Sequence, residues 1–234
     1  MMRDPAAREV AFQAVSLHVE VEGRVILNGV SLEVARGEVV LLKGKNGVGK
    51  STLLRACSGI TPVSKGSVWI AGCDVTSGSM LVRQQAGLAY VPQGGRVFAH
   101  LTVVEHLRIG ARSGTDIPSW LVERTSAMGN RLGRLLSGGE RQILALAAAL
   151  ATRPAVLLLD EPLASLALET AGRVLEALRA VAEKQGTAVL LAEHNVQQAS
   201  EAVHRVIELS GGCLREDPNT HPAHRRVLHF PKSD

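Results

Sequence analysis

Hydrophobic and polar residues alternate in the first part of the chain, as they do in strands with one buried face. Residues 11–21 (AFQAVSLHVEV) and 29–34 (GVSLEV) both follow this alternation. The next segment, residues 37–44 (GEVVLLKG), is a short continuous apolar run that ends in glycine. Such a run is typical of a strand buried on both faces, so we expect this strand to lie inside a sheet.

A helical spacing follows this run. Residues 50–60 (KSTLLRACSGI) predict a helix that stops at Gly59 and Pro62. Two further strands are predicted within residues 66–75 (GSVWIAGCDV) and 87–95 (GLAYVPQGG). Between Gly94 and Leu136 the segments LTVVEHLRIGA and SWLVERTSAMG predict short amphipathic helices. Together with the helix that begins near Ser137, they predict an inserted helical lobe at about residues 94–150.

The rest of the chain alternates strands and helices. Residues 155–162 (AVLLLDEP), 187–194 (TAVLLAEH) and 205–212 (RVIELSGG) predict strands, and helices are expected at about 168–185 and at 195–203. This order favours a parallel sheet covered on both faces. We therefore expect an α/β fold with a mainly parallel core sheet, an antiparallel β portion and the inserted lobe. One domain would span residues 1–216, and residues 217–234 would form an irregular tail.

Composition narrows the class of protein. The hydrophobic content is 46%, enough for a packed core, and the net charge of +4 comes partly from the tail segment AHRRVLHFPK. We therefore expect no nucleic-acid partner. The three cysteines form no CxxC pair, which predicts a reducing cytosol with neither a disulfide framework nor a zinc site. No apolar run reaches the ~20 residues of a membrane-spanning helix, and the N-terminal segment lacks the apolar stretch of a secretory signal.

A phosphate-binding loop is predicted at residues 44–51 (GKNGVGKS). The segment satisfies the pattern G-x-x-x-x-G-K-[ST] and lies between a predicted strand and a predicted helix, as the chemistry requires. Its glycines let the backbone wrap around phosphate oxygens, Lys50 supplies a point charge, and Ser51 offers a hydroxyl to Mg²⁺. The alternative is an ordinary glycine-rich turn that happens to contain Lys and Ser.

Polar residues follow three of the predicted strands. Asp160 and Glu161 come directly after the run VLLL, where Asp160 is placed for a metal ion and Glu161 for polarising an attacking water. Gln93 and His194 end two other strands, and we expect them at the same edge, near the metal or water and near the γ-phosphate. The alternatives are a surface turn for the two carboxylates and ordinary loop positions for the other two residues.

A second anion-binding feature occurs at residues 134–150 (RLLSGGERQILALAAAL). Ser137, Gly138 and Gly139, here called the SGG turn, precede an apolar helix. The unpaired N–H groups and the positive dipole at the start of this helix suit an anion. Because this helix belongs to the lobe, we expect it to lie too far from Lys50 to close on its own nucleotide. In an antiparallel dimer each turn would cap the γ-phosphate held by the other subunit. The alternative is a glycine turn before a core helix.

These motifs, in this order, resemble the nucleotide-binding subunits of ABC transporters over about residues 10–212. The resemblance implies a P-loop NTPase fold of the ABC-ATPase type that binds ATP and Mg²⁺. It makes Glu161 the catalytic base, His194 the γ-phosphate sensor and Gln93 a residue for the metal or water. ATP binding falls on Gly44, Lys45, Asn46, Gly47, Val48, Gly49, Lys50, Ser51 and Thr52, Mg²⁺ binding on Ser51, Gln93 and Asp160, and contact with the opposite subunit's ATP on Ser137, Gly138, Gly139, Glu140 and the two residues that follow.

Within that family, the segment LAYVPQGGRVFAHLTVVEHLRIGA is similar to the ATPase subunits of branched-chain amino acid and urea importers. Ala167 also stands where many other transporters have Asp. The resemblance implies a second ATPase subunit, identical or a sister chain, and polytopic membrane permease subunits as partners. It places the protein in the cytoplasm, peripheral on the inner face of the cell membrane, and implies a small polar solute as cargo.

The chain departs from the family pattern at two places. Val21 occupies the position where such subunits carry an aromatic residue that stacks on adenine, which predicts weak discrimination between ATP and GTP. The helical lobe is also shorter by roughly a dozen residues, about the length of one helix. Two alternatives to a transporter subunit are an ABC-type ATPase acting on a soluble assembly and a P-loop kinase. The absence of a coiled-coil insertion, zinc motif or basic stripe disfavours the first, and the SGG turn disfavours the second.

Overall fold

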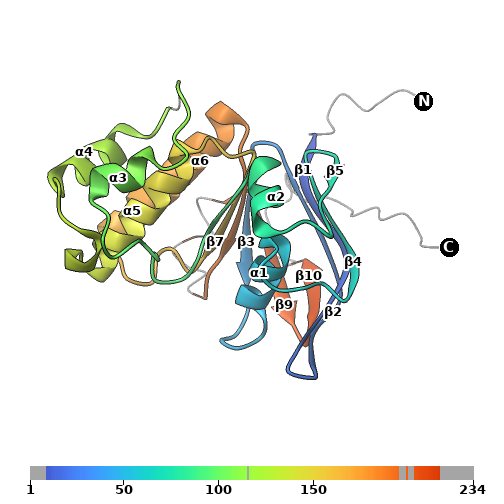
Figure 1. Cartoon of the computed structure of the whole chain (residues 1–234). Coiled ribbons are helices and arrows are strands. Elements are labelled where there is room, and N and C mark those ends of the chain that lie inside the picture. The colour runs from blue at the N-terminus through green and yellow to red at the C-terminus, as the bar shows by residue number, and fades with distance from the viewer. Residues whose placement is uncertain (1–8, 115, 195–198, 200–202, 217–234) are drawn as a thin grey trace.

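The computed structural model describes residues 9–114, 116–194, 199 and 203–216. Two β-sheets and a helical lobe make up this part of the chain (Figure 1). One sheet has four strands in the order β2-β1-β4-β5, and the other has six in the order β10-β9-β3-β8-β7-β6. The strands are β1 (Val10–Val21), β2 (Arg24–Ala35), β3 (Val39–Lys43), β4 (Lys65–Ile70), β5 (Cys73–Asp74), β6 (Leu88–Val91), β7 (Val156–Asp160), β8 (Ala188–Ala192), β9 (Arg205–Ser210) and β10 (Cys213–Glu216).

The six-stranded sheet is the core sheet predicted from the apolar runs. Strands β9, β3, β8, β7 and β6 pair in parallel, and β10 adds an antiparallel edge. Every residue of β7 and β8 is buried, which explains why their sequences are continuous apolar runs. Because parallel strands all end at one edge, the residues that follow β3, β6, β7 and β8 meet there.

The four-stranded sheet is antiparallel and gives the N-terminal segment its alternating pattern. β1 pairs with both β2 and β4, and its inward residues include Phe12, Ala14 and Leu17, all fully buried. They pack with residues of the six-stranded sheet and of α1 (Lys50–Ser58) in one hydrophobic cluster. Helix α1 therefore lies between the two sheets, as Figure 1 shows.

The helical lobe covers the other face of the core sheet together with α6 (Leu168–Gln185). Its elements are α3 (Val103–Arg108), α4 (Ser119–Ala127), the 3-10 helix η1 (Gly133–Leu135) and α5 (Gly138–Ala151). Helices α3 and α5 both start with a capping box, in which a Ser or Thr side chain and a Glu three residues later satisfy each other's backbone N–H groups. Apolar residues of α4, α5 and α6 form a second hydrophobic cluster with β7 and β8.

The structure confirms most predicted elements, divides one of them and adds others that were not predicted, among them the edge strand β10. Helix α6 has the predicted bounds, whereas the single strand predicted at residues 66–75 is a hairpin, β4 and β5, that turns at Ala71 and Gly72 with positive φ. Helix α2 (Met80–Gln85) was not predicted. The helix expected at 195–203 and the tail at 217–234 lie outside the described residues, apart from Ala199 and Val203.

Candidate functional site

The predicted phosphate loop joins β3 to α1, as its pattern requires. Gly47 and Gly49 adopt φ values of 77° and 111°, a region that favours glycine. A side chain at Gly49 would come within 3.0 Å of Ile26, so the loop also needs glycine for packing. Helix α1 has no side-chain cap at its N-terminus. Its first backbone N–H groups are therefore available to an anion, and the helix dipole adds to the attraction.

Lys50 is the buried cation of this loop, whereas Lys45 is exposed. Its ammonium donates hydrogen bonds to the carbonyl oxygens of Gly44 at 2.8 Å and Lys45 at 3.3 Å, and the residue is only 5% exposed. These contacts hold the ammonium group of Lys50 against the loop and keep it away from bulk water. A buried, hydrogen-bonded ammonium beside free N–H donors is suited to bind phosphate oxygens.

Ser51 and Asp160 meet where α1 begins and β7 ends. The Ser51 hydroxyl donates to the Asp160 carboxylate at 3.0 Å, and the Tyr90 hydroxyl donates to the other carboxylate oxygen at 3.3 Å. Burial and the Asp160 charge raise the pKa of Tyr90 to about 12, so its hydroxyl stays protonated and remains a donor. The hydroxyl and carboxylate oxygens are hard donors, as Mg²⁺ prefers.

Gln93 and Glu161 form the second polar pair. The Gln93 amide nitrogen donates to the Glu161 carboxylate at 2.6 Å, which leaves the amide oxygen of Gln93 free to accept or to bind a cation. Both residues line a cavity of about 330 Å³ beside the loop. The other lining residues are Ile26, Asn46, Gly47, Gly49, Lys50, Ser51 and Thr52.

A cation held by few protein ligands suits this cavity. Among the described residues, no group of three or more His, Cys, Asp and Glu side chains is placed to hold a metal ion. Mg²⁺ bound with a nucleotide typically takes one or two protein oxygens and completes its octahedron with phosphates and water. Ser51 and Gln93 line the cavity and can each offer one oxygen, and the buried Asp160 carboxylate supports Ser51 from behind by accepting its hydroxyl hydrogen bond.

His194 lies at the same edge of the sheet but does not line the cavity. It follows β8, its side chain is 51% exposed, and its Nδ1 is 3.9 Å from the carboxylate of Glu193. Glu193 is buried, and burial raises the pKa of its carboxyl group. The structure thus brings Lys50, Ser51, Gln93, Asp160 and Glu161 together, whereas His194 has its contact with Glu193.

The SGG turn lies apart from this cavity. Ser137 caps α5: its hydroxyl accepts from the Glu140 N–H at 3.2 Å, and Glu140 accepts from the Ser137 N–H at 2.8 Å. These hydrogen bonds, and the Arg131 side chain, lower the pKa of Glu140. The Ser137 hydroxyl is thus engaged with Glu140, from whose N–H it accepts and with whose carboxylate it also interacts. None of residues 137–140 lines the cavity at Lys50.

Three residues of the site were not predicted from the sequence. Ile26 on β2 supplies an apolar wall of the cavity, Tyr90 binds Asp160, and Glu193 contacts the turn after β7. Val21, where an adenine-stacking aromatic was expected by resemblance, is 40% exposed at the end of β1 and does not line the cavity.

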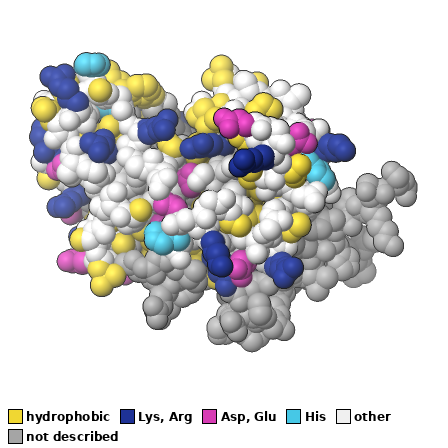
Figure 2. All heavy atoms as spheres, turned by 90° about the horizontal axis from the view of Figure 1, so that it is seen from below, with side chains coloured by type: hydrophobic (Ala, Val, Ile, Leu, Met, Phe, Trp, Pro, Cys, Tyr) yellow, Lys and Arg dark blue, Asp and Glu magenta, His cyan; other side chains and the backbone are white. Residues whose placement is uncertain are grey.

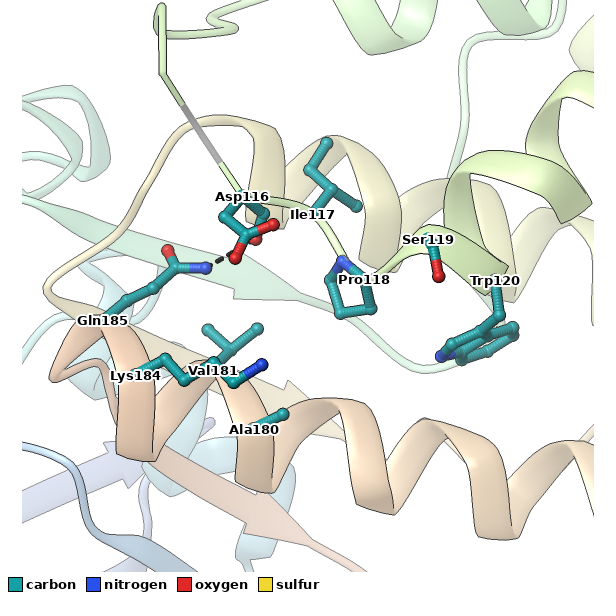
Figure 3. Close-up of a pocket in the computed structure, with 9 residues that line it drawn as sticks. All are labelled: Asp116, Ile117, Pro118, Ser119, Trp120, Ala180, Val181, Lys184 and Gln185. Atoms are coloured by element: carbon teal, nitrogen blue, oxygen red, sulfur yellow. Dashed lines mark hydrogen bonds between the residues drawn. The ribbon is translucent and has the colours of Figure 1, made fainter.

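A second cavity, of about 340 Å³, lies on the lobe and contains none of these residues. Figure 3 shows Val181, Lys184 and Gln185 of α6 facing Ile117 and Pro118, which precede α4. The Gln185 amide donates to the Asp116 carbonyl at 2.6 Å, and the Arg173 guanidinium lies 5.3 Å from the centre of the Trp120 ring. This region joins the lobe to α6.

Charged side chains are mixed on the face of the molecule in Figure 2. Over the described part of this face, Lys and Arg side chains are spread with Asp and Glu between them. In the described part of the chain, no helix is long and apolar enough to span a membrane.

Sequence comparisons find relatives that are named as ATP-binding proteins of transporters. The family model described as ABC transporter matches residues 27–164. A probable branched-chain amino acid transport ATP-binding protein, LivF, of Archaeoglobus fulgidus is 36% identical over 184 residues, covering 75% of this chain and 78% of the relative. A cobalamin import ATP-binding protein, BtuD, of Halobacterium salinarum is 36% identical over 218 residues, covering 88% of this chain and 54% of the relative.

Solved structures share the fold. The ATP-binding subunit of an ABC transporter superposes with a TM-score of 0.78 at 26% identity and covers 87% of this chain and 88% of that one. A dimeric cassette in a post-hydrolysis state with ADP and phosphate superposes with a TM-score of 0.76 at 23% identity, covering 88% and 97%. At that lower identity the likeness concerns the fold alone. The substrates named for the sequence relatives differ from one another.

Proposed function

Because the chain belongs to the ABC transporter family, as an ATP-binding subunit with the P-loop NTPase fold of an ABC ATPase, we propose that it powers an importer of branched-chain amino acids, urea or a similar small polar solute. The observation that carries the catalytic part is one cavity that unites the loop cation Lys50 with Ser51, Gln93 and Glu161. The proposal for the cargo rests on the importer-like segment after β6 and on the LivF relative.

Phosphate binding is the first task of the cavity. The free N–H groups at the start of α1, the backbone of residues 44–49 and the Lys50 ammonium bind the β- and γ-phosphate oxygens of ATP. Ser51, Gln93 and Asp160 hold Mg²⁺, which neutralises phosphate charge when bound. Thr52 lines the same cavity, and Ile26 offers an apolar contact to the rest of the nucleotide.

Activation of water falls to Glu161. Its carboxylate accepts a hydrogen bond from the Gln93 amide, which orients it toward the cavity. There it takes a proton from the water that attacks the γ-phosphate. His194, beside it at the strand ends, contacts the departing phosphoryl oxygens. These groups act by position and charge, which is the main requirement in phosphoryl transfer.

The second subunit completes the site. The SGG turn does not line its own cavity, and as the start of a helix it is suited to bind a phosphate oxygen held by another chain. In an antiparallel dimer, Ser137, Gly138, Gly139 and Glu140 of each chain face the ATP held by the other. A solved cassette of the same fold is dimeric, which supports a dimer for this chain. ATP closes the dimer, and hydrolysis with phosphate release lets it reopen.

Membrane permease subunits are the partners that such closure would move. Exposed apolar side chains lie on α2 and the neighbouring turn (Ile60, Leu81, Val82) and on the lobe (Phe98, Ile109). Two cavities run between these patches and share Tyr90, Pro92 and Arg96. A surface of this kind suits a protein contact, and it would keep the chain peripheral on the cytoplasmic face of the membrane. We propose no nucleic-acid partner.

The experiment that tests the proposal uses Glu161→Gln, which keeps ATP binding and stalls water attack. Light scattering follows the mass of this variant with and without Mg·ATP. We expect an ATP-dependent dimer that is lost when Ser137→Arg is added, and copurification of the wild-type chain with a polytopic membrane protein. A chain that binds no nucleotide would overturn the catalytic proposal, and a variant that binds ATP as a monomer would require a different partner subunit.

A further inference from the structure

The residues at the end of β8 are hydrogen-bonded to the turn that carries Glu161. Two hydrogen bonds connect the two segments: the Glu161 N–H donates to the Ala192 carbonyl at 2.9 Å, and the Leu163 N–H donates to the Glu193 carboxylate at 2.9 Å. The first is a backbone contact that any residue at position 192 can make. The second depends on the side chain of Glu193.

Glu193 is an unusual residue for this position because it is a carboxylate that is 2% exposed. Burial opposes its ionisation and the nearby Glu161 charge adds to that effect, whereas the backbone N–H groups of Leu163 and His194 favour the carboxylate. Buried carboxyl groups are rare unless their oxygens are hydrogen-bonded. Packing alone would favour an apolar side chain here, so the contact with Leu163 is the feature that distinguishes Glu193.

The turn needs an external support. Glu161 has a positive φ of 46°, a conformation that is unfavourable for a residue other than glycine. Such a conformation persists where surrounding contacts impose it. The same turn reaches α5, because a side chain at Gly139 would lie 3.0 Å from the Ser165 carbonyl oxygen. A shift of the turn would therefore displace Glu161 from Gln93 and also disturb the start of α5.

We propose that Glu193 is a positioning residue for ATP hydrolysis: by binding the Leu163 N–H, it holds the turn after β7 so that the Glu161 carboxylate faces Gln93 and the cavity. The inference rests on the proposed role of Glu161 as the base. Glu193 itself does not line the cavity.

The test compares Glu193→Ala with Glu193→Gln and with a control, Glu38→Ala, in the full chain. Gln keeps an oxygen that accepts from the Leu163 N–H, whereas Ala removes it. Glu38 is a similarly buried carboxylate that accepts from the Ala35 N–H and pairs with Arg205, but it precedes β3 at the opposite end of the sheet. Losing it affects stability without touching the turn at 161–166.

Two readouts distinguish positioning from stability. We expect Glu193→Ala to lower kcat for Mg·ATP about tenfold or more, with KM changed less than about twofold, because misplacement of a base costs rate and not affinity. Glu193→Gln should restore most of kcat, and Glu38→Ala should keep kcat per folded molecule. Hydrogen–deuterium exchange should be faster at residues 161–166 in Glu193→Ala alone.

Equal kcat in wild type and Glu193→Ala, or equal loss in Glu193→Ala and Glu38→Ala, would overturn the inference. If Glu193→Ala does not fold, Glu193→Asp is the second variant. Its side chain is shorter by one CH₂ group, so the carboxylate no longer reaches the Leu163 N–H and the same loss of kcat is expected. If the wild type hydrolyses no ATP, the proposed function fails. The exchange measurement then still decides whether Glu193 holds the turn, and unchanged exchange at residues 161–166 would overturn that point separately.

Discussion

The Ser51 hydroxyl donates a hydrogen bond to the Asp160 carboxylate at 3.0 Å, although the two residues are 109 positions apart in the chain. The contact joins the first turn of α1 to the end of β7. It places a buried carboxylate directly beside a hydroxyl oxygen that lines the cavity, where a divalent cation would bind with the nucleotide.

Ser51→Ala should therefore weaken the response to Mg²⁺. We expect the Mg²⁺ concentration for half-maximal ATP hydrolysis to rise roughly tenfold, as is common when a group that supports a metal site is removed. Steady-state ATPase assays over a range of Mg²⁺ concentrations measure this. Ser64→Ala is the control, because the Ser64 hydroxyl only donates to the His18 carbonyl on the far sheet. An unchanged Mg²⁺ requirement in Ser51→Ala would contradict the assigned role.

Nucleotide choice should change at Val21. The wild type should use ATP and GTP with comparable kcat/KM, because Val21 offers no ring for the base to stack on. Val21→Tyr should improve kcat/KM for ATP roughly fivefold, equivalent to about 1 kcal/mol of stacking. Val25→Tyr is the matched control, since Val25 lies on the same hairpin and is 60% exposed. A strong ATP preference in the wild type would show that another side chain contacts the base.

The stability of the protein should depend on pH through Glu193. Burial raises the pKa of Glu193 in the folded state, so the folded protein binds this proton more tightly than the unfolded chain. Stability from this group is fully present below the ordinary Glu pKa of about 4.3 and is lost as pH rises through the folded-state pKa. Glu193→Gln removes the titration, so its free energy of unfolding relative to wild type should increase between pH 4 and pH 7.

Urea unfolding of both proteins at several pH values checks this relation. Glu123→Gln, on an exposed position of α4, controls for the loss of one negative charge. A constant difference between Glu193→Gln and wild type from pH 4 to pH 7 would mean that the Glu193 carboxyl titrates alike in the folded and unfolded states.

Arg83→Leu should destabilise the fold by about 3 kcal/mol. The Arg83 guanidinium is 2% exposed and donates to the Ala56 and Cys57 carbonyls at the end of α1, and to the carbonyls of Thr76 and Gly78. Leucine would leave these buried acceptors without a donor. Chemical denaturation measures the change, and Arg124→Leu on the exposed face of α4 should cost less than about 0.5 kcal/mol. A similar small effect for Arg83→Leu would show that water replaces the guanidinium.

Apolar periodicity predicted the elements that are buried either on all sides or along one continuous side. Strands β3, β7 and β8 are buried on both faces, and α6 has one apolar side over many turns, so their patterns are unambiguous. Helix α2 escaped prediction because its pattern is inverted: Leu81 and Val82 are 62% and 45% exposed, whereas Arg83 is buried. The turn between β4 and β5 was missed because Ala71, a residue with no turn preference, adopts a positive φ.

The site shows the same division. Motif spacing predicted that Lys50, Ser51, Gln93, Asp160 and Glu161 would meet, because each lies at or shortly after the carboxyl end of a strand in one parallel sheet. The roles of Tyr90 and Glu193 depend instead on which neighbouring strand each side chain touches. No single-sequence pattern encodes that choice, since strand order within the sheet is not written in local spacing.

The hydrogen bonds from Lys50 to the carbonyls of its own loop have a consequence for how a nucleotide enters and leaves. The chain closes this loop with its own side chain, so the conformational entropy of the loop is lost during folding and not at each encounter with a ligand. Little of the free energy of phosphate binding is then consumed in ordering the backbone. After product release the loop likewise keeps the same conformation, so the next nucleotide binds to a loop that is already ordered.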